Sequence, residues 1–249
     1  LVACTRSIDA PTNESEEDFS TVQTRRPETT AQILFDDEQY AKTKAWGLHR
    51  TVSFYGLGDN LIHMPIIYDA AIDEETYDFK PIYDPIAEDI ASADIAYINQ
   101  ESIIGGDERG FSGYPAFNTP SDMIPNLVDL GFDWVTGSNN HSLDMGTQGV
   151  YNTLAYWDEY KDDILFTGIF GSQEQRDTIP VYRKNGLTFS LLTYTYGTNG
   201  ILPNQPYFVN YFDPALVSRD VTRAKEISDF VIVASHMGDE HSFSPNQMQ

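Results

Sequence analysis

The sequence predicts an α/β fold in which helices cover both faces of a mainly parallel sheet. Segments typical of strands alternate with segments typical of helices from about residue 50 to residue 234. Several of the strands are apolar throughout, as parallel strands buried on both faces are. Hydrophobic residues make up 41% of the 249 residues. That is enough to form a core, so disorder over the whole chain is excluded.

The expected strands are short and either apolar or rich in β-forming residues. They are segments 51–57, 95–98, 134–136, 164–167, 187–196 and 230–234. Helices are expected between them, at 83–93, 121–130, 147–160 and 213–227. The first helix places Ile86, Ile90 and Ala93 on one face. The second has Ser121 as a plausible cap and Gly131 as its stop.

The N-terminal tetrapeptide 1–4 resembles a bacterial lipobox, in which the cysteine becomes the lipidated first residue of the mature protein. Cys4 is the only cysteine, so the chain forms no intrachain disulfide. The signal peptide of such a protein would precede Leu1. We therefore expect a lipid anchor at Cys4; the alternative is a chance tetrapeptide that holds a free thiol.

Residues 5–48 are expected to form a flexible tether with one short helix. Polar and acidic residues dominate from residue 5 to about residue 35, and a coil of that length spans roughly 30 Å. An ordinary frayed N-terminus is the alternative. Residues 36–47 have acidic residues first, lysines later and Gly47 last, which suits a helix. The main domain is then expected at 49–249.

The charge of the chain limits its partners. There are 15 Lys and Arg against 38 Asp and Glu, for a formal net charge of −23. With no basic cluster, nucleic acid and anionic lipid surfaces are excluded as partners bound by charge. A polyanionic substrate would need a cation to be held here. No run of about 20 apolar residues occurs, so no segment of this sequence is expected to span a membrane.

Polar side chains follow four of the predicted strands, in segments 58–63, 99–101, 138–144 and 235–241. In parallel sheets ligands bind at the carboxyl ends of the strands. We therefore expect Asp59, Glu101, Asn140 and His236 to converge at one sheet edge. Each alone has an ordinary alternative, as a turn residue, a cap, an exposed charge or a core histidine. Together, such oxygen and imidazole donors suit a divalent ion such as Mn²⁺, Fe, Zn²⁺ or Mg²⁺.

These residues resemble the bacterial capsule-synthesis CapA family, which is associated with poly-γ-glutamate capsules and has a calcineurin-like metallophosphatase fold. The resemblance runs from about residue 51 to the last residue. Its motifs are segments 58–59, 99–101, 117–120, 131–133, 139–146 and 236–240, with Thr153 and Gly168. The block 139–146 is the most specific and matches the Gly-Asn-His-Asp/Glu motif of metallophosphatases. The resemblance implies a layered αββα sandwich with mostly parallel central strands.

The resemblance also implies roles for individual residues. Asn140 corresponds to a metal ligand, and Asp59, Glu101 and His236 to ligands or near-ligands. His141 corresponds to the acid that protonates or stabilises a leaving group, and the catalytic group also includes Asp144. Three neighbouring polar residues are expected to bind substrate: Asn60, Asn139 and Glu240.

The sequence departs from the metallophosphatase pattern at three places. Leu61 stands where the first motif has a histidine, and the second strand ends in Asn99-x-Glu101 rather than in a bridging aspartate. A closing Gly-His-x-His motif would be expected downstream of His236, and the sequence stops at Gln249. We therefore expect this sequence to be a fragment that lacks a late strand and its histidines.

Two functions are compatible with this pattern. One is a surface-tethered, metal-dependent hydrolase or transferase that acts on an anionic polymer or phosphoester. The other is a non-catalytic accessory lipoprotein that works with membrane proteins of a capsule-polymerising complex. Either would lie on the extracellular face of the bacterial membrane, held there by its lipid anchor.

Two loops are further candidates for function. Residues 194–212 are rich in aromatic and amide side chains, which can line a substrate cleft or simply cover the sheet edge. Residues 105–118 contain four glycines and are longer than a plain connection. They are not followed by Gly-Lys-Ser/Thr, so they do not form a phosphate loop of that kind.

Overall fold

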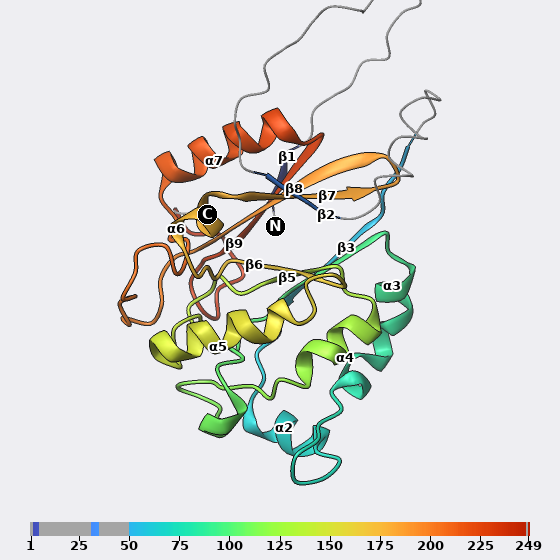
Figure 1. Cartoon of the computed structure of the whole chain (residues 1–249), viewed down its shortest axis with the longest axis vertical. Helices are drawn as coiled ribbons and strands as arrows, with labels where there is room; N and C mark the ends of the chain where they lie inside the picture. Colours follow the sequence, from blue (N-terminus) through green and yellow to red (C-terminus); the bar gives the residue numbers. More distant parts are fainter. Residues whose placement is uncertain (1, 5–30, 35–49, 248) are drawn as a thin grey trace, which may run out of the picture.

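Two β-sheets lie face to face in the centre of the molecule, and helices cover both outer faces (Figure 1). The computed structural model describes residues 2–4, 31–34, 50–247 and 249. The layered α/β sandwich confirms the predicted fold class. The residue pattern alone had indicated one sheet, whereas the strands divide between two.

The four-stranded sheet is entirely parallel, in the order β3-β4-β5-β6. Its strands are Phe54–Asp59, Ile95–Asn99, Trp134–Thr136 and Leu165–Thr167. Because all four run the same way, their carboxyl ends lie at one edge. Asp59 of β3 pairs there with Asn99 of β4, and Asn99 pairs with Thr136 of β5.

The five-stranded sheet is mixed, in the order β1-β9-β8-β7-β2. Its strands, in that order, are Val2–Cys4, Phe230–His236, Leu187–Thr195, Ile179–Lys184 and Ala31–Leu34. The β7 and β8 strands form an antiparallel hairpin, and β8 runs parallel to β9. At the tip of the hairpin Asn185 and Gly186 both have positive φ, 50° and 72°. Two such residues suit the primed turns that match strand twist.

Helices follow most strands of the four-stranded sheet. These are α2 (Met64–Ala70), the 3₁₀ helix η1 (Lys80–Ile86), α3 (Ala87–Ser92), the 3₁₀ helix η2 (Asp107–Arg109), α4 (Met123–Leu130) and α5 (Gly146–Asp158). Two further helices accompany the other sheet: α6 (Gln173–Asp177) and α7 (Pro214–Ile227). The Asp213 side chain caps α7 by accepting a hydrogen bond from Leu216 N.

Three apolar layers hold the sandwich together. The layer between the two sheets contains Tyr97, Trp134, Phe189, Leu191 and Ile232, all buried. A second layer packs the four-stranded sheet against α2 to α5. A third packs α7 onto the outer face of the five-stranded sheet. Of the strands that end at the site, β4 and β5 are buried throughout, whereas β3 and β9 are partly exposed.

The predicted elements agree with the structure except at their boundaries and in a few short elements. The helix expected at 83–93 is interrupted, because Pro85 belongs to η1 and the α-helical part begins at Ala87. The expected cap at Ser121 is wrong: its hydroxyl contacts the Asp107 carboxylate, and α4 begins at Met123. Gly131 ends α4 in the left-handed conformation, as predicted. The elements α2, η2, α6 and β7 were not predicted.

The N-terminal expectations fall mostly outside the described residues. The predicted helix at 36–47 and most of the predicted tether lie there. Ala31–Leu34, placed in the tether by composition, instead pairs in parallel with β7. Val2–Cys4 pairs antiparallel with β9, with Cys4 opposite Val231. Lipidation of Cys4 stays a prediction.

Candidate metal centre

The polar residues that follow the predicted strands meet where the carboxyl ends of both sheets come together. Asp59 is the last residue of β3 and His236 the last residue of β9. Glu101 follows β4 by two residues, and Asn140 lies in the turn after β5. The four-stranded sheet thus supplies Asp59 and Glu101, and the five-stranded sheet supplies His236. The structure brings these four residues together, as the sequence predicts.

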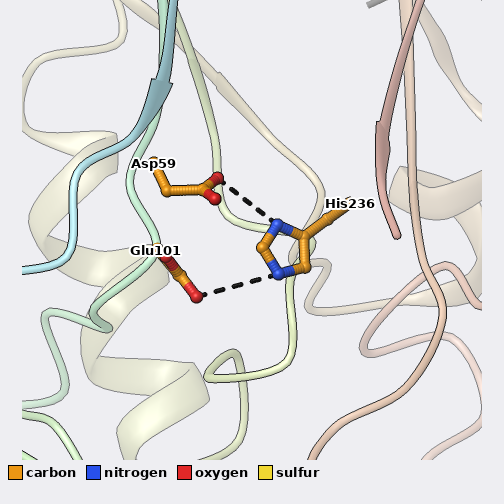
Figure 2. Close-up of side chains that lie close together, drawn as sticks. All are labelled: Asp59, Glu101 and His236. Atoms are coloured by element: carbon orange, nitrogen blue, oxygen red, sulfur yellow. Dashed lines mark ion pairs between the residues drawn. The ribbon is translucent and has the colours of Figure 1, made fainter. Parts of the chain in front are cut away.

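Asp59, Glu101 and His236 form a compact cluster (Figure 2). One donor atom from each lies within 4.8 Å of the others. The His236 ring stands between the two carboxylates, with Nδ1 3.3 Å from Asp59 Oδ1 and Nε2 3.7 Å from Glu101 Oε1. The Glu101 side chain is 9% exposed and that of Asp59 50% exposed. The cluster is therefore buried on one side and open on the other.

Asn99 orients the Asp59 carboxylate, a role that the sequence reasoning did not assign. Its Nδ2 donates to Asp59 Oδ1 over 2.7 Å, and its Oδ1 accepts from Thr136 Oγ1 over 3.1 Å. Thr136 in turn contacts the buried Tyr97 hydroxyl at 2.9 Å. Strand pairing places Asn99 directly beside Asp59, so only the register of β3 on β4 could have identified it.

The turn after β5 brings Asn140 to the cluster. Asn140 Oδ1 lies 2.8 Å from His236 Nε2. The turn is closed by Ser142 Oγ, which donates to Gly137 O over 2.6 Å. Asn139 braces it further, because its Oδ1 accepts from His141 N and its Nδ2 donates to Gln100 O. These bonds fix the backbone on both sides of Asn140.

His141 forms a close pair with Asp144. The distance from His141 Nδ1 to Asp144 Oδ2 is 2.7 Å, and both side chains are buried. The other ring nitrogen, Nε2, lies 4.0 Å from Glu101 Oε1. A carboxylate that holds one nitrogen of an imidazole fixes the ring and its tautomer. The imidazole is therefore directed at the edge of the cluster rather than into its centre.

The cluster shifts the pKa values of its own members. Burial opposes ionisation of Asp59, but hydrogen bonds from His236 and Asn99 outweigh it and lower the Asp59 pKa. Burial, and then the charge of Asp59, raise the Glu101 pKa. Burial works against the charged form of His236, yet its contact with Asp59 and the nearby carboxylate charges raise the His236 pKa. Each of the three groups thus affects the ionisation of the others.

An open cavity of about 450 Å³ lies over the cluster. Its lining includes Asp59, Glu101, Asn140 and His236, and its outer wall is formed by segment 237–245 and Tyr196. The Tyr196 ring stacks on His236 at 6.1 Å and is 45% exposed. In the aromatic loop, therefore, Tyr196 faces the cleft, whereas Tyr194 and Phe208 are buried in the core.

The three expected substrate-binding residues lie in different surroundings. Glu240 is exposed and lines the cavity. Asn60 is buried and hydrogen-bonds to Gln100 Oε1 and to the Tyr83 hydroxyl. Asn139 is 1% exposed and braces the turn. Neither asparagine is among the residues that line this cavity.

The donor set suits a divalent cation. Two carboxylates, one imidazole and one amide oxygen combine the hard and borderline ligands that Mn²⁺, Fe²⁺ and Zn²⁺ accept. Among the described residues, Asp59, Glu101 and His236 are the group of acidic and histidine side chains close enough to share an ion. Half-buried Leu61 stands where the first metallophosphatase motif would offer a second histidine. The site as described therefore supplies ligands for one ion.

Comparison with known proteins identifies the family of the chain. Residues 53–249 match the profile of the family described as bacterial capsule synthesis protein PGA_cap. The chain is similar to the PGA biosynthesis protein CapA of Bacillus subtilis (strain 168), with 28% identity over 141 residues. It is also 33% identical over 102 residues to each of two uncharacterized proteins, y4sH and y4uA, of Sinorhizobium fredii (strain NBRC 101917 / NGR234).

The matched regions are partial. The match to the Bacillus protein covers 53% of this chain and 35% of that protein, and each Sinorhizobium match covers 38% and 22%. The chain thus spans about a third or less of the length of the curated relatives it matches. None of the described helices is long and apolar enough to cross a bilayer.

Proposed function

The chain belongs to the bacterial capsule synthesis family PGA_cap, and from this membership we propose that it acts in capsule synthesis as a metal-dependent hydrolase or transferase. Its proposed substrate is an anionic polymer, poly-γ-glutamate, or a phosphoester. One observation carries the proposal: Asp59, Glu101 and His236 gather within 4.8 Å beside a buried His141–Asp144 pair. A cluster that only stabilised the fold would not need a second, separately oriented imidazole beside it.

The residues have distinct proposed tasks. Asp59, Glu101, His236 and Asn140 hold the ion. When bound, a divalent ion lowers the pKa of a water molecule and neutralises an anionic oxygen of the substrate. His141, with Nδ1–H held by Asp144, donates a proton or hydrogen bond from Nε2 to the leaving group when its ring is in the cationic form that carries a proton on both nitrogens. Asn99 keeps the Asp59 carboxylate turned toward the ion.

The charge of the cavity supports a requirement for the ion. Its charged lining residues are Asp59, Glu101, Asp239 and Glu240, and its lining includes no lysine or arginine. An anionic substrate would be repelled by these four carboxylates. A cation at the cluster provides the attraction that the side chains lack.

The experiment is a metal-dependence assay on the full chain. The protein is stripped with a chelator and reloaded with Mn²⁺, Zn²⁺ or Mg²⁺. It is then offered bis(p-nitrophenyl) phosphate, and separately poly-γ-glutamate whose length is followed by gel electrophoresis. We expect turnover of at least one probe in a metal-loaded sample and none after stripping. Equal rates for stripped and loaded protein, or no turnover with any metal, would contradict catalysis.

A second candidate function is a non-catalytic accessory protein of a membrane capsule-polymerising complex. Leu61 favours it, because an apolar side chain there removes a ligand that a two-metal centre would use. In this function the same cleft would bind polymer without cleaving it. Binding of poly-γ-glutamate by metal-loaded protein that turns over no probe would support it.

The proposed location is the extracellular face of the cell membrane, with Cys4 as the lipid-bearing residue. Two acyl chains would hold the protein there stably, whereas one would not. Mass spectrometry of protein made in its native host tests this. Diacylated or triacylated Cys4 is the expected result, and an unmodified Cys4 in soluble protein would contradict it.

A further inference from the structure

Phe117 packs against the imidazole that is proposed to act as the acid. It is fully buried, and its ring centre lies 4.7 Å from that of His141 at an interplanar angle of 79°. This is the edge-to-face geometry that aromatic pairs prefer. Its backbone N also donates to Asp144 Oδ2 over 2.7 Å. One residue thus contacts the imidazole directly and also holds the carboxylate that pairs with it.

The shared oxygen of Asp144 determines how the His141 ring is oriented. Asp144 Oδ2 accepts from Phe117 N and contacts His141 Nδ1, each at 2.7 Å. A carboxylate only accepts hydrogen bonds, so Nδ1 carries the proton. Asn199 Nδ2 is farther from the same nitrogen, at 3.4 Å, and cannot donate to a protonated Nδ1. Nε2 is then the nitrogen directed at the cluster.

Loop 105–118 is braced in a way that fixes Phe117. The Asn118 side chain accepts from Gly105 N and donates to the carbonyls of Gly106 and Gly110, at 2.7 to 2.8 Å. The backbones of Ser112 and Asn118 exchange two hydrogen bonds. A Cβ at Gly105 would lie 2.5 Å from the Met145 side chain, so the loop packs closely on the turn before α5. Loop 105–118 is thus held in one conformation by its own hydrogen bonds and packing.

His63 also packs against the Phe117 ring. The His63 and Phe117 ring centres are 5.0 Å apart at 83°. His63 itself is exposed. Phe117 thus contacts both the exposed ring of His63 and the buried ring of His141. Motion of the Phe117 ring is therefore restricted by His63 as well as by its own loop.

We propose that Phe117 is a positioning residue for His141, which sets the direction of Nε2 through its ring and its backbone N. The proposal rests on the proposed function, because it assigns a purpose to the orientation of His141. The competing explanation is that Phe117 is an ordinary core residue. Loss of an ordinary core residue would lower stability, but it would leave the His141 tautomer unchanged and would not lower kcat selectively over KM.

The test compares Phe117→Leu with a matched control, Phe111→Leu. Phe111 belongs to the same loop but packs on Tyr77 and not on His141. The ¹⁵N signals of the His141 ring report which nitrogen carries the proton. In wild-type protein and in the control we expect protonated Nδ1 and unprotonated Nε2 in the neutral ring. In Phe117→Leu we expect a mixture of the two forms.

Turnover gives a second readout on bis(p-nitrophenyl) phosphate with Mn²⁺-loaded protein. Phe117→Leu is expected to lower kcat by about 10- to 100-fold, since small misplacements of a catalytic group cost about that much. KM and bound metal are expected to change less than about twofold, and the control to keep the wild-type kcat. If wild-type protein turns over no probe, the proposed function fails. The ¹⁵N spectra then still decide the proposal about Phe117.

A second variant covers the case in which Phe117→Leu does not fold. His63→Ala removes an exposed ring and should leave the fold intact. We expect it to shift the His141 ¹⁵N signals in the same direction, by a smaller amount. A wild-type His141 spectrum in folded Phe117→Leu would overturn the proposal, and so would a wild-type spectrum in His63→Ala if Phe117→Leu cannot be obtained.

Discussion

Replacement of Asp59 by asparagine should separate metal binding from folding. The substitution keeps the shape of the side chain and removes one of the two carboxylate charges in the cluster. In the metal-free protein it removes an ion pair to His236 that is half exposed on the Asp59 side. It also removes the charge of Asp59, which adds to burial in raising the Glu101 pKa. These two effects oppose each other, and half-exposed pairs contribute about 1 kcal/mol or less.

The expected loss of affinity is large. Removing a group that merely orients a metal ligand costs about 10- to 100-fold, so losing a charged ligand should cost at least about 100-fold. Metal at 100 times the wild-type Kd stabilises the wild-type protein by about 2.7 kcal/mol. At the same concentration a variant with 100-fold weaker binding gains about 0.4 kcal/mol. For a chain of this size, 1 kcal/mol shifts Tm by about 2–4 °C. Metal should therefore raise the Tm of wild type by about 5–11 °C and that of Asp59→Asn by about 1–2 °C.

Thermal unfolding of stripped protein, with and without Mn²⁺, measures both quantities. Asp69→Asn is the control, because Asp69 is an exposed aspartate on α2, away from the cluster. We expect the metal-free Tm of Asp59→Asn to lie within about 4 °C of wild type, which corresponds to 1 kcal/mol. The control should show the full metal-induced rise. A full rise in Asp59→Asn would refute the assignment of Asp59 as a ligand.

Three other predictions follow from the contacts. His141→Asn should keep its metal and lose about 10²- to 10⁴-fold in turnover; loss of metal equal to that in Asp59→Asn would make His141 a ligand. Arg176→Met should lower the free energy of unfolding in urea by about 1.5–3 kcal/mol, because it breaks the buried pair with Asp220 at 2.8 Å while Arg219 stays 3.0 Å from the other oxygen of Asp220; an unchanged stability would contradict this. Hydrogen bonds from Ser53, opposed by burial, lower the Asp94 pKa. Wild type should therefore have a higher free energy of unfolding than Asp94→Asn at neutral pH. This difference should shrink as the pH falls below the ordinary value of 3.8 and through the lowered pKa. A constant difference down to the lowest pH at which both proteins fold would contradict this.

The strand ends were predictable because each signal is local. A buried strand followed by polar side chains is visible in the sequence at Asp59, Glu101, Asn140 and His236. Parallel strands of one sheet bring their carboxyl ends together, which accounts for the convergence of Asp59, Glu101 and Asn140. His236 ends β9 of the other sheet, so its place beside them depends on how the two sheets pack. The boundary at Gly131 was predictable for the same reason, since a glycine that follows an apolar helix commonly adopts the left-handed conformation.

Long-range pairing set the limit of prediction. The division into two sheets depends on which strands pair, and no single segment encodes that. Asn60 follows Asp59 directly but points inward to Tyr83, because neighbouring residues face opposite ways in extended backbone. The roles of Asn99 and Phe117 depend on contacts with residues that are 40 and 24–27 positions away. By contrast, Asn185 and Gly186 are a hairpin signal that was present in the sequence and was overlooked.

A crystal structure of Mn²⁺-soaked protein, with anomalous data, tests the metal centre most directly. We expect one strong anomalous peak bonded to oxygen atoms of Asp59 and Glu101 and to a ring nitrogen of His236, with Asn140 Oδ1 as a further ligand. Mn–ligand distances should be close to about 2.0–2.2 Å, as for other first-row ions with such ligands. Absence of a peak at this cluster under saturating Mn²⁺, or a peak held by other residues, would contradict the account.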